Sequence, residues 1–206
     1  MTIDDQILLF FRRFRQAAGN SSLDAPGALD YINDARQSEA VKTKFYRVDV
    51  VATAVGGEPY FVLRDDFTPI EAREWATCNN LPITIKDQAE WARITSGIVF
   101  NPAAVYEKWG MLDKDTFYNF PVAQQGDAFI FKGTALPPAL AAITGADAAL
   151  TDAEARLCVL AAVMQALEDT HDQAGPMLIT EYKELRELVK KRAKPRGARL
   201  HSAPGI

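Results

Sequence analysis

Asp113 and Asp115, followed by Thr116, stand at the spacing of the D-x-D-x-T pattern of phosphotransferases. In that chemistry the first carboxylate attacks phosphorus and the second handles the proton of the leaving group. The motif belongs at the end of a buried hydrophobic strand in a parallel α/β sheet. Here it follows a Trp-Gly-Met-Leu run, 109–112, in a turn-rich part of the chain. A small phosphotransferase or hydrolase is therefore kept only as an alternative.

Other catalytic groups are scarce. The chain has two histidines, His171 and His201, and a serine or cysteine nucleophile would need one of them as its base. Neither Cys78 nor any serine stands in a recognisable nucleophile turn. We therefore expect that the protein is not an enzyme.

Motifs for metals and cofactors are also missing. A calcium-binding loop starting at Asp113 would need glycine at its sixth position and glutamate at its twelfth. The chain has Tyr118 and Gln124 there. Neither the phosphate-binding G-x-x-x-x-G-K-[ST] loop nor the dinucleotide-binding G-x-G-x-x-G turn occurs in the sequence. We predict no metal site and no cofactor.

The strongest charge feature is the segment 190–206, which carries six basic residues and no acidic one. Residues 1–189 hold 17 basic and 27 acidic side chains. Residues 1–189 thus have a net charge near −10, and the arm, residues 190–206, has a net charge near +6. Such an arm favours an acidic partner. Fully extended, its residues would reach about 55 Å. We predict that the partner is bound by the six basic residues of the arm, namely Lys190, Lys191, Arg192, Lys194, Arg196 and Arg199.

The composition of the arm leaves three interpretations open. The first is a solvated terminus without a defined partner, the second is a nucleic-acid contact, and the third is a segment that becomes ordered on an acidic protein surface. Each Lys or Arg could neutralise a phosphate. The arm contains no aromatic residue on which bases could stack.

The remaining composition is that of a soluble protein. The longest apolar run of note, Leu157 to Met164, is far shorter than the roughly 20 residues of a membrane-spanning helix. Near the start, the apolar run 7–11 has acids before it and arginines after it, the reverse of a secretory signal. We expect no membrane segment and no export. Cys78 and Cys158 lie in patterns that read as helices and are predicted to be buried thiols.

Helical periodicity marks both ends of the chain. Caps or breakers bound four segments with apolar residues at helical spacing, and a capping-box pattern opens the first at Thr2 and the third at Thr151. The third is apolar on several faces, which indicates a buried helix. The predicted helices cover residues 2–18, 25–41, 151–170 and 177–194.

The centre of the chain reads as strands. Alternation at 45–53, then Gly56-Gly57 and an apolar run at 60–63, predicts a hairpin. Thr68, Pro69 and Glu71 predict a short helix as far as Cys78. An Ala-rich and Pro-containing connector, 134–145, follows the strands. Further strands are predicted at 83–85, 97–100, 116–120 and 128–131.

These elements predict an α+β fold in which the N- and C-terminal helices form a helical bundle. A small, mostly antiparallel β-region at 45–133 is inserted between them. We expect residues 1–189 to form a single α+β domain. Residues 190–206 form an extended basic C-terminal arm that overlaps the end of the last helix.

The order of segments resembles that of the head-to-tail adaptor proteins of tailed bacteriophages, also called connector or head-completion proteins. The resemblance covers about residues 25–206, although the proline usual before the strand-end aspartate is replaced by Arg64. The closing helices with Tyr182 and a polar tail are also similar. The matching segments are 28–35 (ALDYINDA), 58–67 (EPYFVLRDDF), 100–102 (FNP) with Tyr106, and 126–131 (GDAFIF).

The resemblance implies a structural virion protein without catalysis. Such a protein forms a homo-oligomeric ring of about twelve copies under the portal protein, extends the DNA channel and joins the next tail component. DNA would pass without sequence-specific binding, and the protein would lie in the virion neck after assembly in the host cytoplasm. The arm would hold the portal or a neighbouring subunit. A regulatory binding module whose basic tail contacts nucleic acid remains the main alternative.

Overall fold

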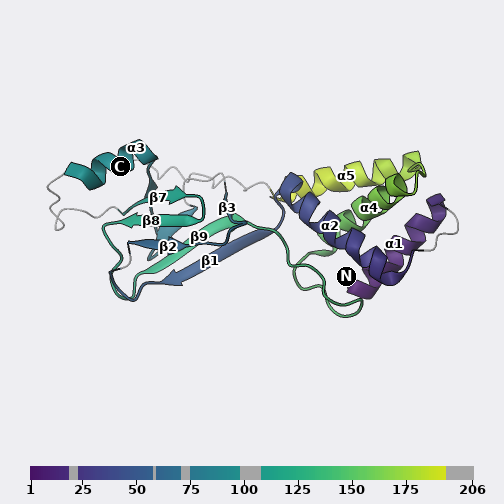
Figure 1. Cartoon of the computed structure of the whole chain (residues 1–206), viewed down its shortest axis with the longest axis horizontal. Coiled ribbons are helices and arrows are strands. Elements are labelled where there is room, and N and C mark those ends of the chain that lie inside the picture. Colours follow the sequence, from purple (N-terminus) through teal and green to yellow (C-terminus); the bar gives the residue numbers. More distant parts are fainter. Residues whose placement is uncertain (19–22, 58, 71–74, 98–107, 194–206) are drawn as a thin grey trace, which may run out of the picture.

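A computed structural model describes residues 1–18, 23–57, 59–70, 75–97 and 108–193. The chain forms two lobes that lie end to end, a helical lobe and a β-lobe (Figure 1). The predicted α+β fold, with a bundle made by the N- and C-terminal helices, is confirmed. Two connections join the lobes, one leading from the second helix into the first strand and one returning from the last strand.

The helical lobe consists of α1 (Ile3–Ala18), α2 (Ala25–Thr43), α4 (Asp152–Asp169) and α5 (Pro176–Ala193). Local side chains define where these helices begin. Thr2 and Asp5 exchange hydrogen bonds at the start of α1, and Asp24 accepts one from the Gly27 amide at 2.9 Å. At α4, Glu154 accepts from the Thr151 amide at 2.9 Å. These bonds satisfy amides that have no partner within the helix.

α4 is the central helix of the bundle, as its apolar faces predict. It contacts α1, α2 and α5. Its side chains from Leu157 to Leu160 are fully buried, and Phe10 and Phe14 of α1 and Ile32 of α2 pack into the same lobe. Burial of each such side chain contributes roughly 1.5–3 kcal/mol.

The β-lobe contains two sheets. In the first, the order is β1-β9-β4-β5, with β3 also paired to β9; in the second it is β2-β8-β7-β6. All pairs are antiparallel except β6 with β7. The strands are β1 (Arg47–Thr53), β2 (Tyr60–Val62), β3 (Thr68–Pro69), β4 (Ala76–Cys78), β5 (Leu81–Pro82), β6 (Thr84–Ile85), β7 (Trp109–Asp113), β8 (Thr116–Phe120) and β9 (Ala128–Thr134).

Aromatic side chains form the core between the two sheets. Phe117 of β8 lies edge-on to Phe131 of β9, with 4.8 Å between ring centroids. Both rings are fully buried. A further helix, α3 (Gln88–Gly97), places Trp91 against Tyr118 and Phe120 of β8. The β-lobe therefore has its own hydrophobic core, separate from that of the bundle.

Several local predictions for this lobe were wrong. The segments 45–53 and 60–63 do not form a hairpin, because β1 pairs with β9 and β2 with β8. The predicted helix to Cys78 is also wrong in its described part. Thr68–Pro69 and Ala76–Cys78 are strands on β9, and burial between β9 and β5 outweighs the local capping signal.

Three of the described elements were not predicted, namely α3, β5 and β7. The predicted strand 97–100 meets the end of α3 at Gly97, and its other residues lie outside the described ranges. The strands at 83–85, 116–120 and 128–131 are confirmed in β6, β8 and β9. Within the described residues, no helix has both the length and the apolar character needed to cross a membrane.

Candidate basic site at the lobe junction

The last turn of α5 carries three of the basic residues singled out from the sequence, Lys190, Lys191 and Arg192. Cations are favoured there because the carbonyl groups at a helix C-terminus bear partial negative charge. Buried Leu178 and Val189 hold the two ends of α5 on the bundle. The other three predicted residues, Lys194, Arg196 and Arg199, lie outside the described residues, so their role stays a prediction.

The structure brings more basic side chains to the same place. A cavity of about 250 Å³ lies where α2 ends, β1 begins and α5 ends. Of the described residues that line it, four are basic and none is acidic. We call it the junction cavity. Its lining residues are Lys42, Thr43, Lys44, Arg47, Pro69, Ile70, Thr134, Lys190 and Ala193.

Backbone contacts position two of these cations. Lys44 caps α2 in a left-handed conformation, φ 53°, and its amide donates to the Ala40 carbonyl at 2.8 Å. Three residues later β1 begins with Arg47, whose guanidinium donates to the carbonyl of Ala193, the last residue of α5. That contact joins the first strand of the β-lobe to the final helix of the bundle.

A buried carboxylate, Glu39, fixes α2 against α5 beside the cavity. It accepts a hydrogen bond from the Tyr182 hydroxyl at 2.9 Å and pairs with Arg186 at 3.3 Å, both on α5. It also pairs with Lys42 at 3.2 Å. Burial, followed by the hydrogen bond to Glu39, raises the pKa of Tyr182 to about 12. The tyrosine therefore stays protonated and serves as a donor at neutral pH.

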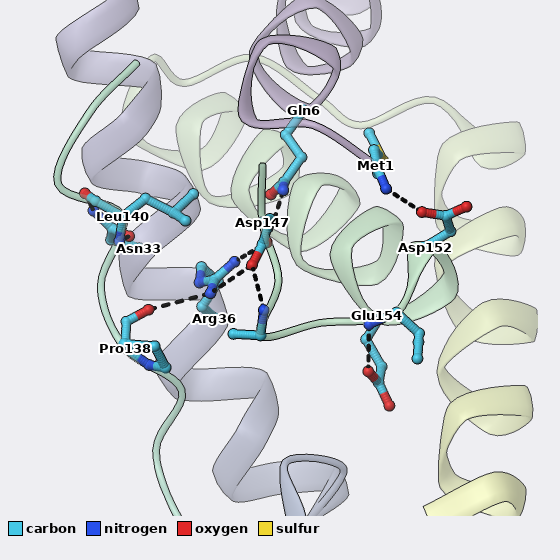
Figure 2. Close-up of polar contacts among 11 residues, drawn as sticks. Met1, Gln6, Asn33, Arg36, Pro138, Leu140, Asp147, Asp152 and Glu154 are labelled. Carbon is cyan, nitrogen blue, oxygen red and sulfur yellow. Dashed lines mark hydrogen bonds and ion pairs between the residues drawn. The ribbon is translucent and has the colours of Figure 1, made fainter. Parts of the chain in front are cut away.

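The connector from β9 to α4 is held by a second buried network (Figure 2). Asp147 in the connector pairs with Arg36 of α2 and accepts from the Gln6 amide of α1 at 2.8 Å. Arg36 also donates to the Pro138 carbonyl at 3.1 Å. Burial alone would raise the pKa of Asp147, but the hydrogen bonds from Arg36 and Gln6 outweigh it and leave the pKa below its usual value. The network fixes the path by which the chain returns from the β-lobe.

The aspartate pair considered for phosphoryl transfer lies in a different setting from that chemistry. Asp113 ends β7 and Asp115 precedes β8, on either side of Lys114 in the tight turn of an antiparallel hairpin. The parallel strand end that the motif requires is therefore not formed here. Among the described residues, no cluster of three or more His, Cys, Asp or Glu could hold a metal ion.

The two cysteines are buried and free, as predicted. Cys158 lies on α4, whereas Cys78 is on β4, so its assignment to a helix was wrong. Burial raises the pKa of both thiols. His171 lies in the turn between α4 and α5, 13 residues after Cys158, whereas Cys78 belongs to the β-lobe. A raised pKa keeps most of each thiol protonated, and the thiolate is the nucleophilic form.

A two-lobed α+β chain with a basic junction cavity is suited to binding an anionic partner. Comparison with known proteins defines the class. The sequence profile described as SU10 adaptor protein matches residues 6–204, nearly the whole chain. The chain therefore belongs to the SU10 adaptor protein family, a family of phage head-to-tail adaptors, and the resemblance noted in the sequence is confirmed. No curated protein was found to match the chain.

Proposed function

We propose that copies of the protein form a ring under the portal, extend the DNA channel and present a surface to the next tail component. Membership in a structural adaptor family supports this role and agrees with a protein that performs no catalysis. The virion neck is the corresponding location, with assembly in the host cytoplasm. About twelve copies would complete such a ring.

The basic arm is the proposed means of attachment. The observation that carries this step is the position of Ala193, which ends α5 and lines the junction cavity. The sequence beyond it adds Lys194, Arg196 and Arg199. Lys190, Lys191 and Arg192 thus begin a row of cations on a helix anchored to the bundle through Val189. An acidic surface of the portal would bind this row with high charge complementarity.

The acidic body complements this role. Residues 1–189 carry 27 acidic and 17 basic side chains, so the surface that faces the channel would repel DNA and let it slide. Residues 1–189 would act as one domain, since the Arg47 guanidinium of β1 donates to the Ala193 carbonyl of α5 and so joins the two lobes.

Truncation tests the arm directly. A chain that ends at Ala193 should keep its circular dichroism spectrum and thermal midpoint, because the buried members of the three hydrophobic clusters lie within residues 3–189. It should fail to bind portal particles in a co-sedimentation assay. A matched variant with Lys194, Arg196 and Arg199 replaced by Gln separates charge from length. Undiminished binding by both variants would refute the role of the arm.

The nucleic-acid alternative gives a different result. A tail that contacts DNA would produce an affinity for duplex DNA that falls steeply with salt. That affinity would disappear from the chain truncated at Ala193, while portal binding would stay unchanged. The adaptor role predicts instead that truncation at Ala193 abolishes portal binding and leaves any affinity for DNA unchanged.

A further inference from the structure

The two ends of α5 carry complementary surfaces. The C-terminal end lines the junction cavity through Lys190 and Ala193. At the other end, Glu168 and Asp169 close α4, and Asp172 follows in the turn. Met177, in the first turn of α5, is 80% exposed. We call residues 168–177 the acidic turn.

The junction cavity is suited to an anionic group attached to an apolar one. Lys42, Lys44, Arg47 and Lys190 provide positive charge, and the remaining wall includes Pro69, Ile70 and Ala193. Within the chain, Lys42 pairs with Glu39 and Lys190 with Glu187. A volume of about 250 Å³ accommodates a few side chains. The cavity is too small for a DNA duplex to enter, and apolar walls do not favour phosphate. A peptide segment with carboxylates beside an apolar side chain fits both features.

The acidic turn has that chemistry. Glu168 and Asp169 are exposed, with Asp169 accepting a hydrogen bond from the Tyr31 hydroxyl at 2.8 Å, and Met177 provides an exposed apolar side chain at the start of α5. Arg13 and Arg156 both pair with Glu181 of α5, and Lys42 is the cation that lines one cavity with Glu168 and Asp169. The turn therefore presents carboxylates to solvent at the end of the bundle remote from the junction cavity.

Glu168 and Asp169 line a second cavity together with Lys42, but Met177 and Lys190 cannot meet within one chain. Residues 177 and 190 lie on one continuous helix, so about 20 Å separates them at 1.5 Å per residue. Complementary patches at opposite ends of a rigid element produce head-to-tail contacts between copies. Such contacts close into a ring when the rotation between copies allows it.

We propose that the acidic turn of one copy docks in the junction cavity of the next, with carboxylates of the turn on Lys44 and Lys190 and Met177 on the apolar wall. This contact deepens the proposed function, on which it rests, by naming the surface that joins neighbouring subunits. It does not require the arm beyond Ala193.

Zero-length crosslinking tests the contact in the unmodified protein. A carbodiimide joins only amines and carboxylates that touch, and mixing ¹⁴N and ¹⁵N chains identifies crosslinks between copies. Assemblies formed alone or on portal particles should yield peptides that join 168–172 to Lys42, Lys44 or Lys190. Assemblies crosslinked only elsewhere, or a protein that assembles under neither condition, would overturn the proposal.

Charge reversal gives a second, independent readout. Lys44→Glu with Lys190→Glu should lower the fraction of chains that sediment as assemblies by about tenfold or more, since like charges would face each other. Glu168→Lys with Asp172→Lys should do the same. A mixture of these two variants should restore assembly. The matched control, Arg93→Glu with Lys183→Glu, changes two exposed side chains outside both surfaces and should assemble as the original chain does.

The outcomes separate this inference from the proposed function. If the chain truncated at Ala193 still forms the crosslink but does not bind portal, the subunit contact holds and the arm is responsible for attachment. If rings form on the portal without the crosslink, the adaptor role stands and the subunit contact is wrong. Binding of a duplex DNA oligonucleotide that protects Lys44 and Lys190 from amine labelling would also overturn the inference.

Discussion

Arg36 and Asp147 face each other in the interior of the helical lobe with side chains only 1% and 2% exposed. One comes from the middle of α2 and the other from the connector that returns from the β-lobe. Both Arg36 amino groups contact the carboxylate, and Gln6 adds a third donor (Figure 2). This pair fixes the connector to the bundle, and with it the entry of the chain into α4.

Removing the Asp147 carboxylate should destabilise the fold. Asp147→Ala leaves the buried guanidinium of Arg36 without its counter-charge, so the free energy of unfolding should fall by about 3–5 kcal/mol. Urea denaturation followed by circular dichroism measures this. The double variant Arg36→Met with Asp147→Leu should lose less, because no buried charge remains unpaired. A double variant that is as unstable as Asp147→Ala would contradict this explanation.

Acid should weaken the same contact. The folded-state pKa of Asp147 is lowered, so the pair stabilises the fold above the unfolded-state pKa near 4 and is lost as pH falls through the folded-state value. The stability difference between the original chain and Asp147→Asn should be full at pH 7 and shrink below about pH 4. Urea titrations at several pH values measure it. Parallel stability curves for the two proteins would show that Asp147 does not titrate as expected.

Close packing at Gly133 should forbid a larger residue. A Cβ atom placed there would meet the Phe67 ring and lie 2.7 Å from the Thr68 carbonyl oxygen. Gly133→Ala should therefore destabilise the β-lobe by about 1–3 kcal/mol, as overpacking does. Gly175→Ala is the matched control, because nothing lies within 4 Å of its Cβ position. Equal thermal midpoints for the two variants would contradict the packing at β9.

Both thiols should be inert in the folded protein. Cys78 and Cys158 are buried, and burial raises the pKa of each. Because the thiolate is the reactive form, labelling by a maleimide at pH 7 should be slow until urea unfolds the chain. Mass spectrometry of labelled peptides distinguishes the two sites. Rapid labelling of Cys158 under native conditions would show that α4 opens readily.

Local signals allowed part of this structure to be predicted. The capping residues Thr2, Asp24 and Thr151 act within one helical turn, so they define helix starts without knowledge of the rest of the chain. Alternating residues in 47–53 likewise predict a strand. Its partner is β9, nearly eighty residues further along, and a turn signal at Gly56 could not reveal that.

The candidate site was predictable only in part. Lys190 belongs to a basic run that stands out in the sequence. Lys44 and Arg47 are separated from it by more than 140 residues, and they join it only because α2 and α5 end side by side. Single cations on a helix end or strand start carry no signal of a shared cavity. Packing of α2 against α5 through Glu39 and Tyr182 brings these cations together.

Electron microscopy of the chain mixed with its cognate portal tests the central claim most directly. The proposed function predicts rings of this protein stacked on the portal, with density for the segment after Ala193 against the portal surface. The chain truncated at Ala193 should leave the portals bare. Portals that stay bare with the full chain would contradict the account, as would rings on which the truncated chain assembles equally well.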